Sequence, residues 1–349
     1  MKTVKIANTI VGEGSPCFII AEAGVNHNCD IELAKRLIDV AKEAGADAVK
    51  FQTFHAQEVV TKDAEKAEYQ KLNTPARESQ YDMISKLELG EQDLGELFTY
   101  AQKKDIVFLS SPFDKESVDL LDGLGVSAFK IPSGEITNYP LLKHVAGKKK
   151  PIILSTGMST LGEIEEALNV IRGEGAEEII LLHCVSCYPA KIEDINLKAM
   201  ETMRCAFNLP VGLSDHSTGI SVAIAATALG ACVIEKHFTF DKKLPGPDHS
   251  FSLMPDELRQ MVIAIREVER AIGNGVKRST LSEEGNKRHV RRSIVAMVNI
   301  PGGAVITEDM IGIKRPGAGI EPRYLNMVIG RRARKNIAAG SRITFAEIL

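Results

Sequence analysis

The sequence has no tryptophan and no long apolar run. Its 349 residues contain only 6 Tyr and 12 Phe as aromatic residues. A membrane-spanning helix needs about 18 or more consecutive apolar residues, so the absence of such a run argues against a spanning segment. The first ten residues, MKTVKIANTI, also lack the apolar core of a secretory signal peptide. We therefore expect a cytoplasmic protein without membrane contacts.

The six cysteines do not form the regular framework of a small secreted protein. A chain of this length can bury a sufficient core without disulfides. Cys184 and Cys187 form a CxxC motif. A structural zinc site would need a second pair of ligands at similar spacing, and none accompanies this motif. We expect both residues to be reduced thiols near the end of a strand.

The charge is distributed unevenly along the chain. Residues 276–349 carry 14 Lys and Arg against 6 Asp and Glu, a net charge of +8, whereas the remaining residues carry 29 against 40, a net charge of −11. Such a basic segment suits an anionic ligand or an acidic protein surface. It has neither an aromatic-rich stacking pattern nor a helix-turn-helix, so we expect no binding of nucleic acid.

The first 275 residues alternate between short β-rich runs and amphipathic helical runs. The runs are rich in Val, Ile, Leu and Phe and nearly continuous in apolar character, as is typical of parallel strands buried on both faces. Eight strands that alternate with helices favour a closed (β/α)₈ barrel, the TIM barrel, over an open sheet. The expected strands are 17–23, 47–52, 106–111, 127–133, 151–156, 178–184, 211–215 and 232–238, and the clearest helices are 31–44, 161–172, 219–229 and 256–272.

Three regions follow from this pattern. We predict a barrel domain over 1–275, a polar linker over 276–290 and a small, mostly β domain over 291–349. Within the last region, NIPGGAVIT (299–307) and NIAAGSRIT (336–344) form a weak internal repeat. In the barrel, the polar, Glu- and Lys-rich segment 54–90 is the longest interruption, and we expect it to form an elaborated loop and helix over the barrel mouth.

Polar residues stand at the end of every predicted strand, where the chemistry of such barrels is located. Taken singly, a lysine there is more often a surface ion-pair partner and a histidine more often a structural residue. Their coincidence at all eight strands favours an enzyme over a scaffold. In chain order these residues include Glu22, Lys50, Gln52, Ser111, Lys130, Ser133, Glu135, Ser155, His183, Ser186, Tyr188, Ser214, His216, Glu235 and His237.

The residue types agree with one another. Lys50 and Lys130, with several serine hydroxyls, suit an anion such as phosphate or carboxylate. Two imidazoles at adjacent strand ends, His216 and His237, can hold a divalent metal ion with open positions. Glu22 is a candidate acceptor of sugar hydroxyls and Glu135 a candidate acid or base.

Several segments together resemble the sialic acid synthase family. They are FIIAEAGVNHN (18–28), AVKFQT (48–53), FLSSPF (108–113), KIPSGEITNYPLL (130–142), LSTGM (154–158), LLHCVSCYP (181–189), GLSDHSTG (212–219), EKHFT (235–239) and PGPDH (245–249). KRPGAGI (314–320) matches the antifreeze-like (SAF) domain that this family appends to its barrel. The resemblance runs from near residue 17 to the C-terminus, and the order of the motifs makes it specific.

The resemblance implies roles for individual residues. Phosphoenolpyruvate would be bound by Lys50, Ser111, Lys130, Ser133, Ser155, Ser186 and Ser214. The sugar would be bound by Glu22, Gln52, Tyr188, Asp248 and Arg315. His216 and His237 match ligands of a divalent metal ion, Mn²⁺ before Mg²⁺ or Co²⁺, and Glu22, Lys130, Glu135 and His237 would act in catalysis. Ser186 stands where some relatives have asparagine, and Arg315 would reach the partner's barrel in a domain-swapped homodimer.

The implied reaction is the condensation of phosphoenolpyruvate with the open-chain aldehyde of N-acetylmannosamine. Carbon 3 of phosphoenolpyruvate attacks the aldehyde, carbon 2 takes up water, and phosphate leaves by C–O cleavage, giving N-acetylneuraminate. The acceptor can also be a 2,4-diacetamido-trideoxy sugar, giving legionaminic or pseudaminic acid, or a phosphorylated mannosamine. Octulosonate- and heptulosonate-phosphate synthases share this chemistry but would lack KRPGAGI. A protein that binds carbohydrate or nucleic acid through its basic segment is the alternative from another class.

Overall fold

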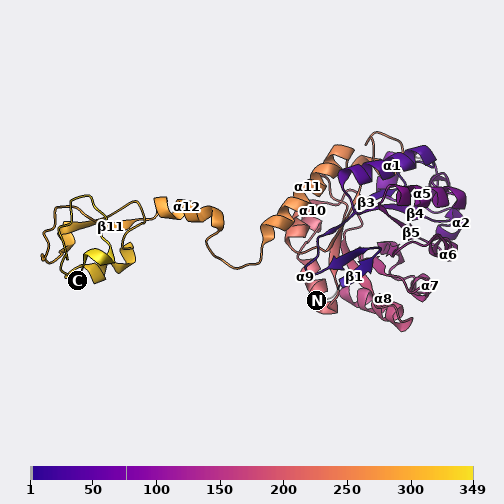
Figure 1. Ribbon diagram of the computed structural model, residues 1–349. Coiled ribbons are helices and arrows are strands. Elements are labelled where there is room, and N and C mark those ends of the chain that lie inside the picture. The colour runs from indigo at the N-terminus through magenta and orange to yellow at the C-terminus, as the bar shows by residue number, and fades with distance from the viewer. Residues whose placement is uncertain (1–2, 76, 349) are drawn as a thin grey trace. The chain divides into compact units, whose positions relative to one another are not determined.

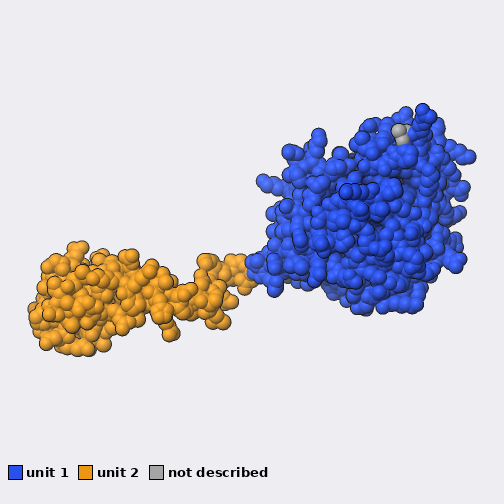
Figure 2. All heavy atoms as spheres, turned by 90° about the horizontal axis from the view of Figure 1, so that it is seen from above, with its two compact units in different colours: residues 1–273 blue, residues 274–349 orange. Residues whose placement is uncertain are grey.

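The chain divides into two compact units, Met1–Gly273 and Asn274–Leu349 (Figure 2). The computed structural model describes residues 3–75 and 77–348. In this described part, no helix combines the length and apolar character that crossing a bilayer requires.

Unit 1 is a barrel of parallel strands surrounded by helices (Figure 1), which confirms the predicted fold. Neighbouring strands pair in the order β5-β4-β3-β10-β9-β8-β7-β6, and the two end strands, β5 and β6, contact each other. The strands differ from their predicted bounds by at most two residues at either end: β3 (Phe18–Gly24), β4 (Ala48–Thr53), β5 (Val107–Pro112), β6 (Phe129–Ile131), β7 (Ile152–Ser155), β8 (Ile179–Cys184), β9 (Val211–Asp215) and β10 (Val233–His237).

A helix follows each strand and packs its apolar side on the outside of the barrel. These helices are α1 (Ile31–Ala44), α5 (Glu91–Lys103), α6 (Lys115–Leu124), α7 (Tyr139–Gly147), α8 (Leu161–Gly173), α9 (Ala199–Phe207), α10 (Ser221–Ala228) and α11 (Pro255–Ile272). In α1, the Asp30 side chain accepts hydrogen bonds from the first backbone amides, and Gly45 ends the helix at φ 85°. Leu37, Ile38 and Ala41 of this helix are fully buried in the layer between helices and strands.

An N-terminal hairpin covers the opposite end of the barrel from the strand C-termini. Its strands are β1 (Thr3–Ile6) and β2 (Thr9–Gly12), which pair antiparallel. Val4, Ile6 and Val11 pack with Phe18, Val233 and other apolar side chains of the barrel interior. The sequence analysis did not predict this hairpin, because strands of four residues are too short to show a clear periodicity.

The segment between β4 and α5, where we predicted an elaborated loop and helix, forms short helices and loops. The helices are α2 (Ala56–Val59), α3 (Glu68–Asn73) and α4 (Gln80–Ser85). The Asn73 amide donates to Pro247 O at 3.3 Å and to Ser250 Oγ at 3.0 Å, which ties α3 to the loop after β10. This loop contains η3 (His249–Phe251), and further 3₁₀ turns are η1 (Ser133–Glu135) and η2 (Ile192–Asp194).

Unit 2 is a small β-rich body with its own core. Its elements are α12 (Leu281–Val290), β11 (Ser293–Ala296), β12 (Ile311–Lys314) and α13 (Leu325–Val328), with the turns η4 (Glu308–Met310), η5 (Pro322–Tyr324) and η6 (Phe345–Glu347). The predicted linker 276–290 therefore contains a helix. Glu283 accepts hydrogen bonds from Thr280 in a capping box. None of the side chains of α12 is buried, so its sequence has no apolar stripe from which the helix could be predicted.

The internal repeat of unit 2 pairs with itself. Ile300 and Ile337 exchange two backbone hydrogen bonds of 2.9 and 2.8 Å. The Asn336 side chain accepts from Gly302 N, and the Asn299 side chain accepts from Ala339 N, both at 2.8 Å. Equivalent residues therefore make equivalent contacts, and the two copies are related by an approximate twofold axis. Ile300, Ile306, Ile337 and Ile343 form the core between them.

Candidate active site

A cavity of about 530 Å³ opens at the C-terminal ends of the barrel strands. One side is polar and includes Gln52, Ser133, Ser186, His237 and Asp248. The other side is built by the segment between β4 and α5. The strand C-termini are the catalytic end of such barrels, so this cavity is the candidate active site.

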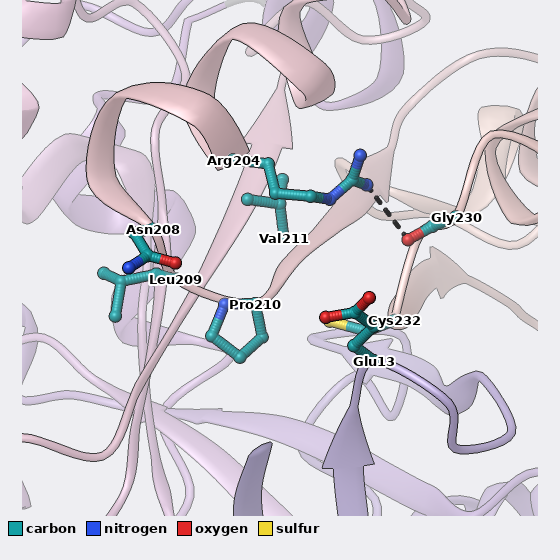
Figure 3. A pocket seen from close by; sticks show the side chains of 8 residues that line it. All are labelled: Glu13, Arg204, Asn208, Leu209, Pro210, Val211, Gly230 and Cys232. Carbon is teal, nitrogen blue, oxygen red and sulfur yellow. Dashed lines mark hydrogen bonds between the residues drawn. The ribbon is translucent and has the colours of Figure 1, made fainter. Parts of the chain in front are cut away.

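A second hollow lies at the other end of the barrel, beside the starts of β9 and β10 (Figure 3). Its arginine, Arg204, bonds Gly230 O at 3.1 Å and pairs with Glu201. Residues at this end of such barrels usually contribute to stability and not to catalysis. We therefore assign no chemistry to this hollow.

Four charged side chains form a buried cluster inside the C-terminal end of the barrel. Lys50 Nζ lies 2.5 Å from Glu22 Oε2, 3.7 Å from Glu235 Oε2 and 2.9 Å from Ser111 Oγ. Lys130 Nζ lies 3.3 Å from Glu235 Oε1, which also accepts a 2.9 Å hydrogen bond from Ser214 Oγ. Glu235 thus joins the two lysines. The interior of a barrel carries such charges at a high desolvation cost, which is typical of functional sites.

The two carboxyl groups of this cluster titrate in opposite directions. Burial raises the pKa of Glu22, and Lys50 offsets this only in part. Burial acts in the same sense on Glu235, but Lys130 and Lys50 together hold its pKa well below the usual range. Glu235 is therefore a permanent carboxylate between two ammonium groups, whereas Glu22 can bind and release a proton near neutral pH.

Serine residues and a backbone amide complete a cradle for an anion. Ser155 Oγ is buried and has no hydrogen-bond partner among the described residues. Ser133 Oγ accepts a 2.9 Å hydrogen bond from Gly157 N. An added Cβ at Gly157 would overlap Ser186 Oγ and would lie 2.8 Å from Ser133 Oγ. Hydroxyls that converge on a bare backbone in this way suit phosphate oxygens.

We expect Gly157→Ala to raise the KM for the anionic substrate about 100-fold, because a displacement of about 1 Å in a binding group can cost this much. The methyl group would occupy the space between Ser133 and Ser186. Steady-state kinetics measure the change. Gly162→Ala on α8 is the control, because its nearest neighbour would lie 3.9 Å away. Equal KM values for the two variants would contradict the cradle.

The two histidines expected to bind metal lie side by side. The ring centroids of His216 and His237 are 5.6 Å apart. His216 Nδ1 lies 2.9 Å from Val185 O. In metal-binding histidines, a hydrogen bond of this kind from one ring nitrogen orients the other nitrogen toward the ion. Burial, and next the nearby His216, lower the pKa of His237 well below its usual range, so its ring is neutral. Neutral imidazoles with a fixed orientation fit a divalent metal ion.

The histidines would supply only two ligands from the protein. In the residues that the structure describes, no group of three or more His, Cys, Asp and Glu side chains has the geometry of a metal site. Asp248 Oδ2 lies 3.8 Å from His237 Nδ1, and burial raises the pKa of Asp248 to about 6. Such a site leaves positions open for substrate and water.

Three of the residues expected to bind sugar, Glu22, Tyr188 and Asp248, lie close to these histidines. The ring of Tyr188 lies 4.3 Å from that of His216. Gly24, at φ 53°, allows a close approach: an added Cβ would lie 3.2 Å from Glu22 Oε1, 3.4 Å from His237 Cε1 and 3.5 Å from Asp248 Oδ2. Three predicted groups therefore converge on one point of the chain.

Two predicted site residues are not part of this convergence. Glu135 is half-buried on η1, where its carboxylate accepts a 2.7 Å hydrogen bond from Asn138, and it does not line the cavity. Arg315 is exposed on unit 2. The roles of Glu135 near the reacting centre and of Arg315 in a domain-swapped dimer stay predictions.

Other polar residues at the strand ends serve the structure of the barrel. His183 Nε2 lies 2.6 Å from Ile195 O. Lys236 faces away from the barrel interior and binds Asp215 at 2.7 Å in a buried ion pair. His249 Nδ1 lies 2.6 Å from Thr239 Oγ1, so it fixes the loop after β10 and does not line the cavity.

Three further residues of the site, Glu235, Tyr69 and Phe251, had no predicted role. Glu235 stands two residues before His237, and alternation along a strand places both on the barrel interior, so this signal was available. Tyr69 lines the cavity, and its ring lies 4.9 Å from that of Tyr188, which in turn lies 5.2 Å from Phe251. These aromatic contacts join segments far apart in the sequence and carry no local signal.

Comparison with known proteins identifies the family of this chain. Residues 37–277 match the NeuB family, and residues 291–349 match the SAF domain. The chain is 52% identical to N,N'-diacetyllegionaminic acid synthase of Campylobacter jejuni over 91% of this chain and 96% of that protein. It is 48% identical to the Legionella pneumophila enzyme of the same name, over 97% and 96%.

A solved structure supports the same assignment. The N-acetylneuraminic acid (sialic acid) synthetase of Leptospira borgpetersenii is 35% identical, with a TM-score of 0.72 over 82% of this chain and 95% of that chain. The family match spans more than half of this chain. The chain belongs to the NeuB family of phosphoenolpyruvate-dependent nonulosonic acid synthases and carries a C-terminal SAF domain.

Proposed function

We propose that this enzyme condenses phosphoenolpyruvate with a 2,4-diacetamido-trideoxy sugar to form a legionaminic-type acid and phosphate. The sequence motifs favoured N-acetylmannosamine as the acceptor, with this sugar as the alternative. The order changes because the two relatives named for legionaminic acid are 52% and 48% identical, whereas the sialic acid synthetase is 35% identical. The buried cluster of two lysines and two glutamates carries the proposal that an anion reacts here.

The chain's own residues bind and orient phosphoenolpyruvate in this proposal. Its phosphate and carboxylate are bound by Lys50, Lys130 and the hydroxyls of the cradle, which also stabilise the departing phosphate. Glu235 lies 3.7 Å from Lys50 Nζ and 3.3 Å from Lys130 Nζ, so its negative charge offsets the repulsion between the two ammonium groups. Glu22 is buried beside Lys50 and has a raised pKa, so it can exchange a proton with the sugar or with the incoming water.

The acceptor is oriented by Gln52, Tyr188 and Asp248, which line the cavity. The family is generally metal-dependent. A divalent metal ion held by His216 and His237 would supply Lewis acidity for the aldehyde oxygen. Carbon 3 of phosphoenolpyruvate then bonds to the aldehyde carbon, water adds to carbon 2, and phosphate leaves with the bridging oxygen.

The experiment that tests this function measures phosphate release with phosphoenolpyruvate, Mn²⁺ and a panel of amino sugars. We expect release to depend on an acylated amino sugar. Phosphoenolpyruvate labelled with ¹⁸O at the bridging oxygen should give labelled phosphate. Label retained in the sugar product would exclude C–O cleavage, and activity only with arabinose or erythrose phosphates would favour a different condensation.

A further inference from the structure

The cavity has an apolar side that the reaction of phosphoenolpyruvate does not require. We call it the acceptor wall: Phe54, which follows β4, Val59 of α2, and Met83, Ile84 and Leu87 of α4 and the turn after it. Phe54, Met83 and Leu87 are buried, and Val59 and Ile84 are half-buried. The wall faces the same cavity as Asp248, His237 and Ser186. A ligand that reaches the polar side therefore also meets this wall.

The segment that builds the wall is highly charged, yet it keeps its charges out of the cavity. Twelve of residues 54–90 are Lys, Arg, Asp or Glu. None of the described ones lines the cavity. The one buried lysine, Lys66, turns to Thr74 Oγ1 at 2.8 Å and to Glu78 at 3.8 Å. The segment thus offers no cation to a phosphate group on the sugar.

Neutral amides also line the cavity. Gln52, Gln70 and Gln80 all line the cavity. The Gln70 carbonyl oxygen accepts a 2.9 Å hydrogen bond from Ala67 N, which holds this side chain in place. A primary amide can both donate a hydrogen bond to an acetamido group and accept one from it. It carries no positive charge to stabilise a phosphate group.

We propose that the acceptor wall, with Gln80 and Gln52, recognises an uncharged sugar that carries a second acylamino group and a deoxygenated carbon. Methyl groups of these substituents pack on Val59, Met83 and Leu87, and the amides bind the glutamines. A phosphorylated acceptor is rejected because its charge would be buried against apolar side chains without a cation. This inference rests on the proposed function and adds the residues that choose the sugar.

The size of the expected preference follows from known pocket energetics. One methylene group in an apolar pocket changes specificity by about 10- to 200-fold. The wall would contact at least one methyl group that N-acetylmannosamine lacks. We therefore expect the 2,4-diacetamido-2,4,6-trideoxy sugar to exceed N-acetylmannosamine by about 10-fold or more in kcat/KM, with the 6-phosphate of N-acetylmannosamine the poorest acceptor.

The test compares these three acceptors at fixed phosphoenolpyruvate and Mn²⁺ in the full-length protein and in two variants. Met83→Gln keeps the length of the side chain but adds an amide to the wall. Val59→Thr replaces a half-buried methyl by a hydroxyl at nearly constant volume. We expect each to lower the preference for the diacetamido sugar about 10-fold through a higher KM for that sugar.

Controls separate this inference from the proposed function. Ser85→Ala changes an exposed residue of α4 that does not line the cavity, and its preference should equal that of the unchanged protein. Thermal unfolding shows whether each variant folds. If Met83→Gln does not fold, the acceptor preference of Val59→Thr tests the inference. An unchanged preference in the folded variants overturns the inference while the function stands. A preference for the phosphorylated sugar overturns both the inference and the proposed acceptor. Absence of phosphate release with every acceptor overturns both.

Discussion

Glu235→Gln is expected to lower kcat/KM for phosphoenolpyruvate by about 10²- to 10³-fold, the cost of losing one preorganised charge in a catalytic site. The carboxylate lies between Lys50 and Lys130 and accepts a hydrogen bond from Ser214. Glutamine keeps the shape and the Ser214 contact but removes the negative charge. The two lysines would then repel each other. Burial already lowers the pKa of Lys130, and loss of the Glu235 charge would lower this pKa further.

The same substitution should also destabilise the barrel. Removing one partner of a buried ion pair costs about 3–5 kcal/mol, because the other charge stays buried. Denaturant unfolding measures this change and steady-state kinetics the loss of activity. Glu178→Gln, at an exposed position just before β8, is the matched control and should change neither quantity. If Glu235→Gln behaves like this control, the carboxylate does not hold the lysines in place.

His237→Ala should abolish metal-dependent turnover while the barrel stays folded. The ring contributes one of two converging imidazoles, and a metal site reduced to one histidine from the protein loses most of its affinity. We expect a rise in the Kd for Mn²⁺ of at least about 10- to 100-fold, by analogy with the loss of supporting groups around metal sites. Electron paramagnetic resonance measures the concentration of free Mn²⁺, and therefore this Kd, in the absence of substrate.

His144→Ala serves as the matched control for this prediction. His144 lies on α7 and pairs with Asp119 at 2.7 Å, outside the cavity. Its loss should leave both Mn²⁺ binding and turnover near the level of the unchanged protein. Full activity of His237→Ala in metal-free buffer would remove the case for a metal at these histidines.

Much of the fold could be read from the sequence, because parallel strands buried on both faces leave continuous apolar runs. Each of the eight predicted strands lies within two residues of its observed bounds. The helix over 31–44 was equally clear, since Asp30 and Gly45 cap it. The hairpin of β1 and β2 and the helix α12 escaped prediction, because the former is short and the latter buries nothing.

The candidate site was only partly predictable. Strand ends identify residues that can meet in a barrel, and Lys50, Lys130 and His237 followed from this rule. The rule does not rank the residues that meet there. Glu235 received no role, although it joins both lysines.

The sequence alone determined the barrel, the order of its strands along the chain and the set of polar residues at one end, because these depend on local periodicity and on a fixed topology. Only the tertiary structure decided which of these residues touch. It placed Glu235 between the lysines, turned Lys236 outward, and brought α2 and α4 over the mouth as an apolar wall. The physical reason is that burial and pairing of charges depend on distances across the barrel, which no stretch of sequence records.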